Sequence, residues 1–287
     1  FQMTRKVDAW AKVNLSLRVT GKREDGYHLI SSIFSKVGLG DTLSITATQD
    51  GAVRVECSEP GVPCDRTNLA ARAAMALQPM ARPGLGARIE ITKRIPVAAG
   101  LGGGSSDAAA ALQALNEMWE VGLEPDKLAE LALGLGADVP FFLGSPMAHV
   151  QGIGEKITPL SPRRPIPMIL ANPGFGISAA EAYRGGRFDF RPASDMGQVI
   201  EDMERGDPAR VVRHMENDLA PWAMEEYGSL GRLKAALERL DPAPLTVAMS
   251  GSGPTLMAIY PTPEAMAAAT ERAKEVAPWV FGVMTLV

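Results

Sequence analysis

The sequence predicts an α+β fold with two lobes. Its strand patterns and helix patterns follow one another without the regular strand–helix–strand rhythm of a parallel sheet. Four prolines between residues 159 and 167 mark a linker near the middle of the 287-residue chain. We therefore expect one lobe over residues 1–160 and a second lobe over residues 161–287.

The first lobe is expected to be rich in strands. Apolar and polar residues alternate over residues 7–20, which is the period of a half-buried strand, and a charged turn follows at residues 21–26. Further strands are expected at 39–48, 52–56 and 87–92, and helices at 68–77, from the alanines at 108–111 to about 119, and at 125–135.

The second lobe is expected to mix helices and strands. A buried strand at residues 168–171 follows the linker. Helices are then expected at 195–204, 208–215, 230–240 and 263–276, and strands at 246–249, 255–260 and 280–286. A Ser-Gly-Ser-Gly loop at residues 250–253 separates two of these strands.

The composition limits the classes of function. A net charge of −4 and a pI of about 5.6 argue against a general nucleic-acid binder or a protein of the membrane surface. No apolar run reaches the roughly 18 residues of a membrane span, and no signal-peptide pattern is present. Cys57 and Cys64 lack the partners of a zinc site, so we expect a reduced, cytoplasmic protein, and a disulfide between them stays open.

A glycine-rich segment at residues 96–107 is the most informative feature of the chain. It holds four glycines in five positions and connects the expected strand at 87–92 with a helix of small residues. Glycines let a backbone approach a ligand closely, and the N–H groups at the start of a helix attract phosphate. The segment therefore predicts a phosphate site, with a ligand-free connector as the alternative.

Its spacing excludes three familiar phosphate-binding loops. No lysine follows the glycines as a P-loop requires, and Ser105 stands where a dinucleotide-binding loop needs its last glycine. The glycine loop of protein kinases lies between two strands, whereas this segment opens a helix.

Two charged residues stand in apolar surroundings. Lys12 shares a strand face with Asn14, where its ammonium could stabilise a phosphoryl group in transfer; the alternative is a lysine that faces solvent. Asp138 is the only acid between Glu130 and Glu155, and it is either functional or satisfied locally as a turn or cap residue.

Two further segments are candidates for ligand contacts. Tyr27 and His28 could stack on a base and bond its edge, although a turn with a half-buried tyrosine is the alternative. The 250–253 loop could close a phosphate site together with the first glycine segment. His149 and His214 have no spaced partners and are expected to be structural.

Three segments together resemble the motifs of the GHMP kinases, named after galactokinase, homoserine kinase, mevalonate kinase and phosphomevalonate kinase. They are residues 9–15, 96–106 and 249–253. Residues 25–28, 136–142, 154–156 and 217–219 extend the resemblance to one branch of that family, so that it spans about residues 9–260.

The resemblance implies a two-lobed fold, with an N-terminal lobe similar to ribosomal protein S5 domain 2 and a ferredoxin-like C-terminal lobe. It implies an enzyme that uses ATP and Mg²⁺ to phosphorylate the 2-hydroxyl of 4-diphosphocytidyl-2-C-methyl-D-erythritol. That reaction gives ADP and the 2-phosphate in the non-mevalonate route to isoprenoid precursors.

The resemblance also implies roles for individual residues. Lys12 and Asp138 match the catalytic pair, with Asp138 on the 2-hydroxyl and Lys12 on the moving phosphoryl group. Ser105 or Ser106 would lie near Mg²⁺, and no other metal ligand is expected. The residues that match the ATP site are Pro96, Val97, Ala98, Ala99, Gly100, Leu101, Gly102, Gly103, Gly104, Ser105 and Ser106, with Asn68 near the adenosine.

For the substrate, Tyr27 and Tyr183 would stack on both faces of the cytosine and His28 would meet its edge. The other residues matched to substrate binding are Asn14, Gly251 and Ser252. Two positions depart from the family pattern. Ala179 stands where threonine is usual, and Gln151 replaces a small or polar residue.

Three other functions stay open at this point. They are another small-molecule GHMP kinase acting on homoserine or mevalonate, a catalytically silent nucleotide-binding regulator, and a glycine-rich oxidoreductase, which the loop spacing already disfavours. We expect a small-molecule substrate, no nucleic-acid or membrane partner, and a monomer or weak homodimer.

Overall fold

The computed structural model describes residues 3–191 and 196–287. The chain forms two compact units that interleave along the sequence. Unit 1 comprises Phe1–Ala11, Leu39–Val97 and Gly102–Gly144, and unit 2 comprises Lys12–Gly38, Ala98–Leu101 and Ser145–Val287. The contiguous lobes 1–160 and 161–287 differ from this division and stay a prediction.

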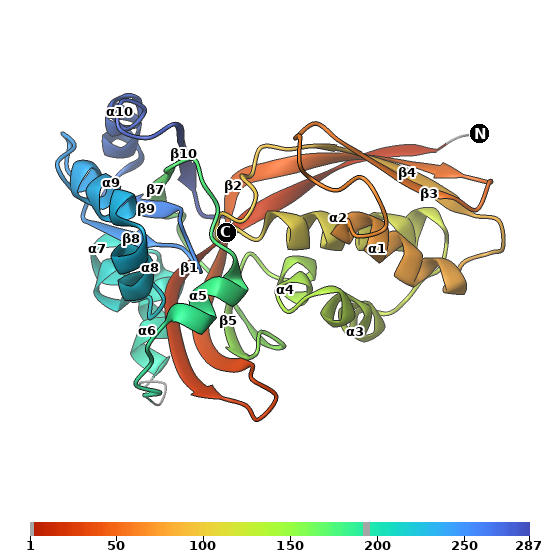
Figure 1. The fold of residues 1–287 in the computed structure, drawn as a ribbon, viewed down its shortest axis with the longest axis horizontal. Coiled ribbons are helices and arrows are strands. Elements are labelled where there is room, and N and C mark those ends of the chain that lie inside the picture. The colour runs from red at the N-terminus through yellow and green to blue at the C-terminus, as the bar shows by residue number, and fades with distance from the viewer. Residues whose placement is uncertain (1–2, 192–195) are drawn as a thin grey trace. The chain divides into compact units, whose positions relative to one another are not determined.

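Unit 1 is a layer of strands covered by helices. Strand β4 (Gly86–Thr92) pairs in parallel with β3 (Val53–Cys57) and antiparallel with the second part of β2 (His28–Thr48). Helices lie together on one side of β3 and β4 (Figure 1). They are α1 (Leu69–Leu77), α2 (Gly103–Met118), α3 (Pro125–Leu135) and α4 (Val139–Leu143), and the short 3₁₀ helix Gln78–Met80 follows α1.

Unit 2 contains two groups of strands. The long strand β1 (Thr4–Lys22) pairs with β2 and enters unit 2 at Lys12. The first part of β2 also pairs with β5 (Met147–Gly152), which pairs with β6 (Lys156–Leu160). The second group is an antiparallel sheet with strand order β10-β7-β9-β8. Its strands are β7 (Pro167–Asn172), β8 (Thr246–Met249), β9 (Leu256–Ile259) and β10 (Trp279–Met284).

The helices of unit 2 connect the strands of this antiparallel sheet along the chain, and the last two of them pack on it. They are α5 (Ala179–Gly185), α6 (Met196–Arg205), α7 (Pro208–Val211), the 3₁₀ helix Val212–His214, α8 (Ala220–Glu226), α9 (Gly228–Glu238) and α10 (Pro263–Ala273). None of the helices within residues 3–191 and 196–287 is long and apolar enough to cross a membrane.

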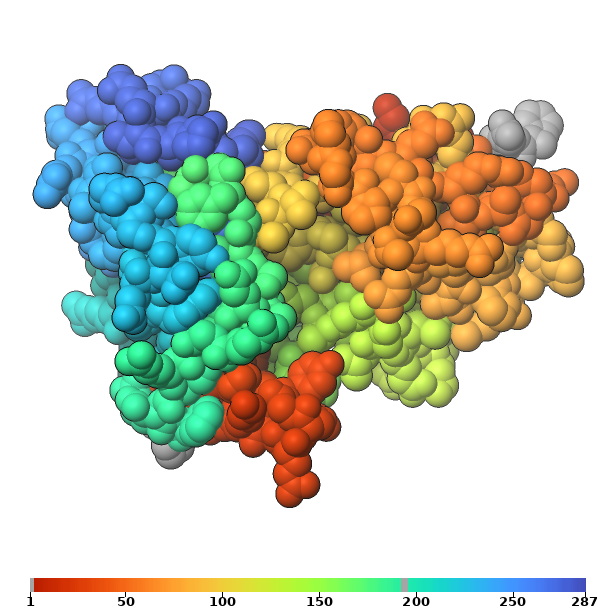
Figure 2. All heavy atoms as spheres, viewed as in Figure 1, coloured from red at the N-terminus to blue at the C-terminus, as the bar shows by residue number. Residues whose placement is uncertain are grey.

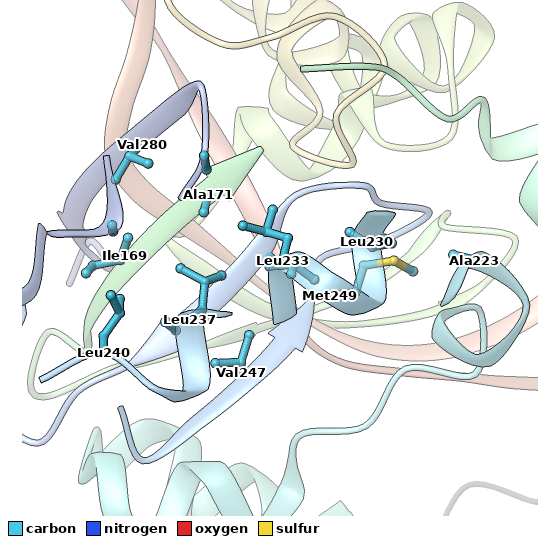
Figure 3. Packing of buried hydrophobic residues seen from close by; sticks show 14 of the residues in the cluster. Ile169, Ala171, Ala223, Leu230, Leu233, Leu237, Leu240, Val247, Met249 and Val280 are labelled. Carbon is cyan, nitrogen blue, oxygen red and sulfur yellow. The ribbon is translucent and has the colours of Figure 1, made fainter. Parts of the chain in front are cut away.

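Helix α9 supplies one side of the core of unit 2. Leu230, Leu233 and Leu237 recur at the three- and four-residue spacing of one helix face, and they pack toward Val247 and Met249 of β8 (Figure 3). All five side chains are buried. This apolar layer fixes the strand on which the 250–253 loop begins.

The expected elements are largely present, with corrections. The helix after the glycines begins at Gly103 rather than near residue 108, because Gly102 adopts the left-handed conformation (φ 69°) at the helix N-cap. The expected strand at 39–48 is the end of a strand that begins at His28. The helix expected at 208–215 divides into α7 and a 3₁₀ turn, and Asp195 lies outside the described residues.

The sequence did not predict β5, β6, α4, α5 or α8. Strand β5 is buried on both faces over Met147–Val150 and so lacks the alternation that reveals a strand. The other four span five to seven residues each, which is too short for a clear period. The linker is also shorter than expected, because β6 ends at Leu160 and β7 begins at Pro167.

Candidate active site

Strand β1 carries a buried lysine in unit 2. The Lys12 side chain shares a strand face with Asn14, and its Nζ donates a 2.6 Å hydrogen bond to Asn14 Oδ1. The ammonium also lies 4.5 Å from the centre of the Phe34 ring, a cation–π contact. Lys12 is only 5% exposed, so the alternative of a solvent-facing lysine is wrong.

Asn14 is the centre of a small polar network. Its Nδ2 donates to Ser32 Oγ over 3.0 Å, and its backbone N–H donates to Ser250 Oγ over 3.2 Å. Ser32 in turn donates to the carbonyl of Ser16. With both ends of its amide bonded, Asn14 holds a fixed orientation beside Lys12.

The middle of the glycine segment, Ala98–Leu101, belongs to unit 2 and is tied there through its carbonyls. Lys12 N–H donates to Leu101 O over 2.9 Å, and Ile177 N–H donates to Ala98 O over 2.9 Å. Ser250 Oγ donates to Gly100 O over 3.0 Å. The first glycine segment is therefore bonded to the strand that carries Lys12 and to the second glycine loop.

Two glycines let these loops touch. Gly100 has φ +75°, and a Cβ there would collide with the carbonyl of Ser250. Gly251 has φ +56°, and a Cβ there would lie 3.0 Å from Asn14 Oδ1 and 3.1 Å from Gly100 O. Only glycine fits both positions, so the sequence-based expectation that the two loops act together has a geometric basis.

Helix α2 begins at the other end of the segment, in unit 1. Gly103, Gly104 and Ser105 occupy its first turn, where backbone N–H groups have no partner within the helix. Ser105 is half-buried, and Ser106 is 2% exposed. A 16-residue helix with glycines at its positive end suits phosphate, as the sequence predicts.

Asp138 stands at the N-cap position of α4 in unit 1. It is half-buried, and its side chain makes no capping hydrogen bond to the helix. This excludes a capping hydrogen bond to α4, and the functional role of Asp138 stays a prediction. Because Lys12 belongs to unit 2, the pairing of these two side chains stays a prediction.

A buried charge cluster holds both ends of the glycine segment in unit 1. Lys93 Nζ donates to Asp41 and, over 2.9 Å, to Asp107 Oδ2. Asp41 Oδ1 also accepts from the N–H groups of Arg94 and Ile95 at 2.6 and 2.9 Å. All three charged side chains are at most 7% exposed.

Burial dominates the electrostatics of Asp107. Desolvation raises the pKa of its carboxyl to about 7, against the attraction of Lys93 and with the repulsion of Asp41. One ammonium here serves two carboxylates, and the Asp107 Oδ1 atom is buried without a hydrogen-bond partner among the described residues.

Aromatic side chains gather where unit 2 carries Tyr27 and His28. The His28 ring stacks on Tyr183 at 5.3 Å between centroids and 18° between planes, and it meets the edge of Phe188 at 5.2 Å. Burial, and then the charge of Lys22, lower the pKa of His28. Tyr27 is 60% exposed, on a turn that stands out from the surface (Figure 2).

The stacked pair bears on the expected cytosine site. A base needs about 3.4 Å on each side to stack, so it cannot enter between His28 and Tyr183 as they stand. A sandwich of cytosine between Tyr27 and Tyr183 therefore requires the other face of Tyr183, or a movement of His28.

Gln151, one of the two departures from the family pattern, lines a pocket of about 240 Å³ in unit 2. Thr20, Ser31 and Lys156 also line it, so its wall is partly polar. Ala179, the other departure, is the exposed first residue of α5.

Comparisons with known proteins show the family of the chain. The pattern described as GHMP kinases N terminal domain matches residues 68–145, and that described as GHMP kinases C terminal matches residues 199–278. A 4-diphosphocytidyl-2-C-methyl-D-erythritol kinase of Symbiobacterium thermophilum is 39% identical over 284 residues, covering 98% of this chain and 100% of that protein. The chain belongs to this family of GHMP kinases.

Two other members of the family support the assignment. The 4-diphosphocytidyl-2-C-methyl-D-erythritol kinase of Shouchella clausii is 40% identical over 257 residues, covering 90% of this chain and 86% of that protein. A crystal structure titled 4-(cytidine 5'-diphospho)-2C-methyl-D-erythritol kinase superposes with a TM-score of 0.82 at 34% identity, covering 98% and 99% of the two chains. Membership of this kinase family implies the use of ATP.

Within this 4-diphosphocytidyl-2-C-methyl-D-erythritol kinase fold, the predicted residues lie in several places. The structure brings together Lys12, Asn14, Gly100 and Gly251, and it stacks His28 on Tyr183. Asn68 caps α1, accepting from Ala70 N–H over 2.9 Å and donating to the Pro63 carbonyl. Its contact with adenosine stays a prediction, as do the ligand contacts of the other assigned residues.

Several residues of the site escaped the sequence analysis. Ser16 continues the alternation of Lys12 and Asn14 along β1, so the strand period could have found it. Phe188 lies in a Phe-Asp-Phe run close to Tyr183 in sequence. Lys93 and Asp41 were not singled out, because a charged residue just after a strand, such as Lys93, or within one, such as Asp41, usually faces solvent.

The two cysteines are both free, with Cys57 half-buried and Cys64 exposed. The disulfide that the sequence left open is therefore absent from the structure. His149 and His214 each bond a neighbouring side chain, His149 with Ser31 and His214 with Asp202, both at 2.9 Å. These contacts fit the structural role predicted for the two histidines.

Proposed function

We propose that this chain transfers the γ-phosphoryl group of ATP to the 2-hydroxyl of 4-diphosphocytidyl-2-C-methyl-D-erythritol, giving ADP and the 2-phosphate. The observation that carries the proposal is the buried Lys12 ammonium, held by Asn14 on a strand that is bonded to both glycine loops. The proposed acceptor comes from the relatives, which are named kinases of this substrate and match nearly the whole chain.

Phosphoryl transfer needs positioning and charge stabilisation more than covalent chemistry. The N–H groups at the start of α2 would bind the phosphates of ATP. Lys12 would stabilise charge on the group in transfer, and its fixed contact with Asn14 limits the reorganisation that this costs. Asp138 would accept the proton of the attacking hydroxyl.

The hydroxyl group of Ser105 is a suitable ligand for magnesium. Ser105 is half-buried in the first turn of α2, where its oxygen would reach a metal carried by the nucleotide. When bound, Mg²⁺ neutralises charge on the β- and γ-phosphates. We further propose that the enzyme works in the cytoplasm as a monomer or weak homodimer.

On the substrate side, Tyr183 and Tyr27 would stack on the cytosine and His28 would bond its edge. The exposed Tyr27 ring favours this role, because a large aromatic side chain in water gains stability when a base covers it. The Gly251–Ser252 peptide, next to Asn14, would contact the diphosphate of the substrate.

The test is ADP release with Mg-ATP and 4-diphosphocytidyl-2-C-methyl-D-erythritol, beside mevalonate and homoserine. ADP only with the cytidyl substrate supports the proposal. ADP with a control substrate instead would retain the phosphate site but reject the cytosine pocket. ATP binding without ADP release from any acceptor would indicate a silent nucleotide-binding regulator.

Asp138→Ala tests the mechanism directly. A general base contributes about 10²–10⁴-fold to a rate, so kcat should fall by that factor while Mg-ATP binding persists. Asp126→Ala, an acid in the first turn of α3, is the matched control and should keep the wild-type rate. A near-wild-type kcat for Asp138→Ala would contradict the mechanism.

A further inference from the structure

Asn217 holds the second glycine loop with both hydrogens of its amide. Its Nδ2 donates to the carbonyls of Met249 and Gly251, each over 2.8 Å. Its Oδ1 accepts from the N–H of Leu219 over 2.9 Å, which fixes the orientation of the amide. One half-buried side chain therefore binds the loop on both sides of Ser250.

The segment around Asn217 is itself fixed to β1. Leu17 N–H donates to Glu216 O over 2.8 Å, and Asp218 N–H donates to Leu17 O over 3.0 Å. Asp218 Oδ2 accepts from the N–H of Val19 over 2.8 Å. Asn217 thus joins the loop to the same strand that carries Lys12 and Asn14.

The 250–253 loop contacts both Asn14, which binds Lys12, and Gly100 of the first glycine segment. Ser250 Oγ accepts from Asn14 N–H and donates to Gly100 O. Gly251 packs so closely against Asn14 Oδ1 and Gly100 O that a Cβ would stand at about 3 Å from each. A small displacement of the loop would therefore move the partners of Asn14 and Gly100 together.

We propose that Asn217 is a positioning residue for phosphoryl transfer, acting through the 250–253 loop on Asn14 and Gly100. Asn217 touches neither nucleotide nor acceptor in this role, which rests on the proposed function. The chemistry requires an amide at this position. A carboxylate would keep the acceptor for Leu219 but lose both donors and face two carbonyl oxygens at 2.8 Å.

The test is Asn217→Asp, with kcat and the two KM values measured on enzyme shown to be folded by its thermal transition. We expect kcat to fall at least tenfold and the Kd for Mg-ATP, measured without acceptor, to rise at least fivefold. Asn217→Ala, which loses the donors without adding a charge, should move both quantities in the same direction by a smaller factor.

Asn116→Asp is the matched control in unit 1. Asn116 also binds a loop through both ends of its amide, accepting from Leu123 N–H over 2.9 Å and donating to Leu123 O over 3.2 Å. This variant should lower the melting temperature but leave kcat and both KM values within twofold of wild type. Equal losses in the two Asp variants would reduce Asn217 to a structural role and overturn the proposal.

The two proposals fail in different ways. Wild-type enzyme that binds Mg-ATP but releases no ADP with the cytidyl substrate would reject the proposed acceptor. The Kd comparison between Asn217→Asp and Asn116→Asp would still test the positioning role in that case. Wild-type activity with unchanged kinetics and Mg-ATP binding in folded Asn217→Asp would reject the positioning role alone.

Discussion

The glycine segment is held by charges in unit 1 and by neutral hydrogen bonds in unit 2. In unit 1, the Lys93 ammonium bonds both Asp41 and Asp107. Lys93 lies just before the glycine segment and Asp107 lies in α2, so this cluster links the two ends of the segment. In unit 2, the carbonyls of Ala98–Leu101 accept from backbone N–H groups and from the hydroxyl of Ser250.

These two sets of contacts, the charged anchor in unit 1 and the neutral anchor in unit 2, differ in how much stability is lost when one partner is removed. A buried ion pair contributes little net stability, but removing one partner leaves an uncompensated charge. A neutral hydrogen bond contributes about 1 kcal/mol, and its loss leaves one polar atom unpaired. In unit 1, losing one charged partner should therefore cost much of the stability that the cluster gives to the ends of the segment. In unit 2, losing one of the hydrogen bonds to the middle of the segment should cost only a small amount.

Breaking the charged anchor should have the largest effect. Lys93→Met leaves Asp41 and Asp107 without their ammonium, and the free energy of unfolding should fall by about 3–5 kcal/mol, as measured by urea denaturation. Lys127→Met is the matched control, because the Lys127–Glu130 pair is 66% exposed on both sides and should change stability by less than about 0.5 kcal/mol.

A double variant distinguishes the loss of charge compensation from a general loss of packing. Adding Asp107→Leu to Lys93→Met removes one of the stranded carboxylates and should recover part of the lost stability. A loss below about 1 kcal/mol for Lys93→Met would show that the cluster is not the anchor that its burial suggests.

Widening the close contact between Gly100 and the Ser250 carbonyl in unit 2 should have the next largest effect. Gly100→Ala places a methyl group against the Ser250 carbonyl at φ +75°, a strain of about 1–3 kcal/mol. The variant should lose at least a hundredfold in kcat/KM, measured by ADP release, because the two glycine loops must separate.

Gly134→Ala is the control for a glycine without such contacts. It lies in helix α3 with open space around it and should stabilise the protein by about 0.5–1 kcal/mol. Wild-type kinetics in Gly100→Ala would mean that the loops tolerate separation, contrary to the geometry.

The pH dependence of the unfolding free energy should distinguish the charged anchor from the neutral one. Asp107 has a folded-state pKa raised to about 7, above its unfolded value, so the folded state binds the extra proton. Its contribution is present below the unfolded pKa and is lost as pH rises toward 7, by at most about 1.4 kcal/mol per pH unit.

The measurement is the difference in unfolding free energy between wild type and Asp107→Asn from pH 4 to pH 8. The stability of wild type should decline relative to that of Asp107→Asn over this range. A flat difference would show that Asp107 stays ionised throughout and that Lys93 compensates both carboxylates.

The smallest effect is expected from the neutral network. Ser250→Ala removes the hydroxyl between Asn14 N–H and Gly100 O and should cost about 1–2 kcal/mol, with no dependence on pH between 5 and 8. Ser35→Ala, another buried serine of unit 2 with a 3.3 Å bond to Lys36 O, should cost no more than that and leave kcat unchanged. A larger loss of stability from Ser35→Ala would contradict the prediction that the Ser250 hydroxyl contributes more than another buried serine.

Much of the fold was predictable from local signals. Residues 7–20 alternate in polarity and lie in β1, and Pro125 and Pro263 each stand at the first position of a helix. The predictions failed where such signals are weak. Strand β5 is buried on both faces, and α4 has only five residues. Tertiary packing forms these elements, so a local pattern does not reveal them.

The candidate site was predictable to a similar degree. The glycines were visible because few other roles require so many of them, and Lys12 and Asn14 shared a face by strand period. The bond between Lys12 and Asn14 and the contact between Gly100 and Gly251 follow from that pattern once the fold exists. The stacking of His28 on Tyr183 was not predicted, because it depends on the packing of α5.

By itself, the sequence determined the α+β class, the family and the glycine-rich segment for which phosphate binding is proposed, because spacing and composition encode those features locally. Only the tertiary structure decided the burial of Lys12, the hydrogen bonds of Asn217 to the 250–253 loop and the Asp41–Lys93–Asp107 cluster. These features depend on contacts between residues that are distant in sequence. Whether a charge or an amide is functional is set by what surrounds it in space, and a linear pattern does not carry that information.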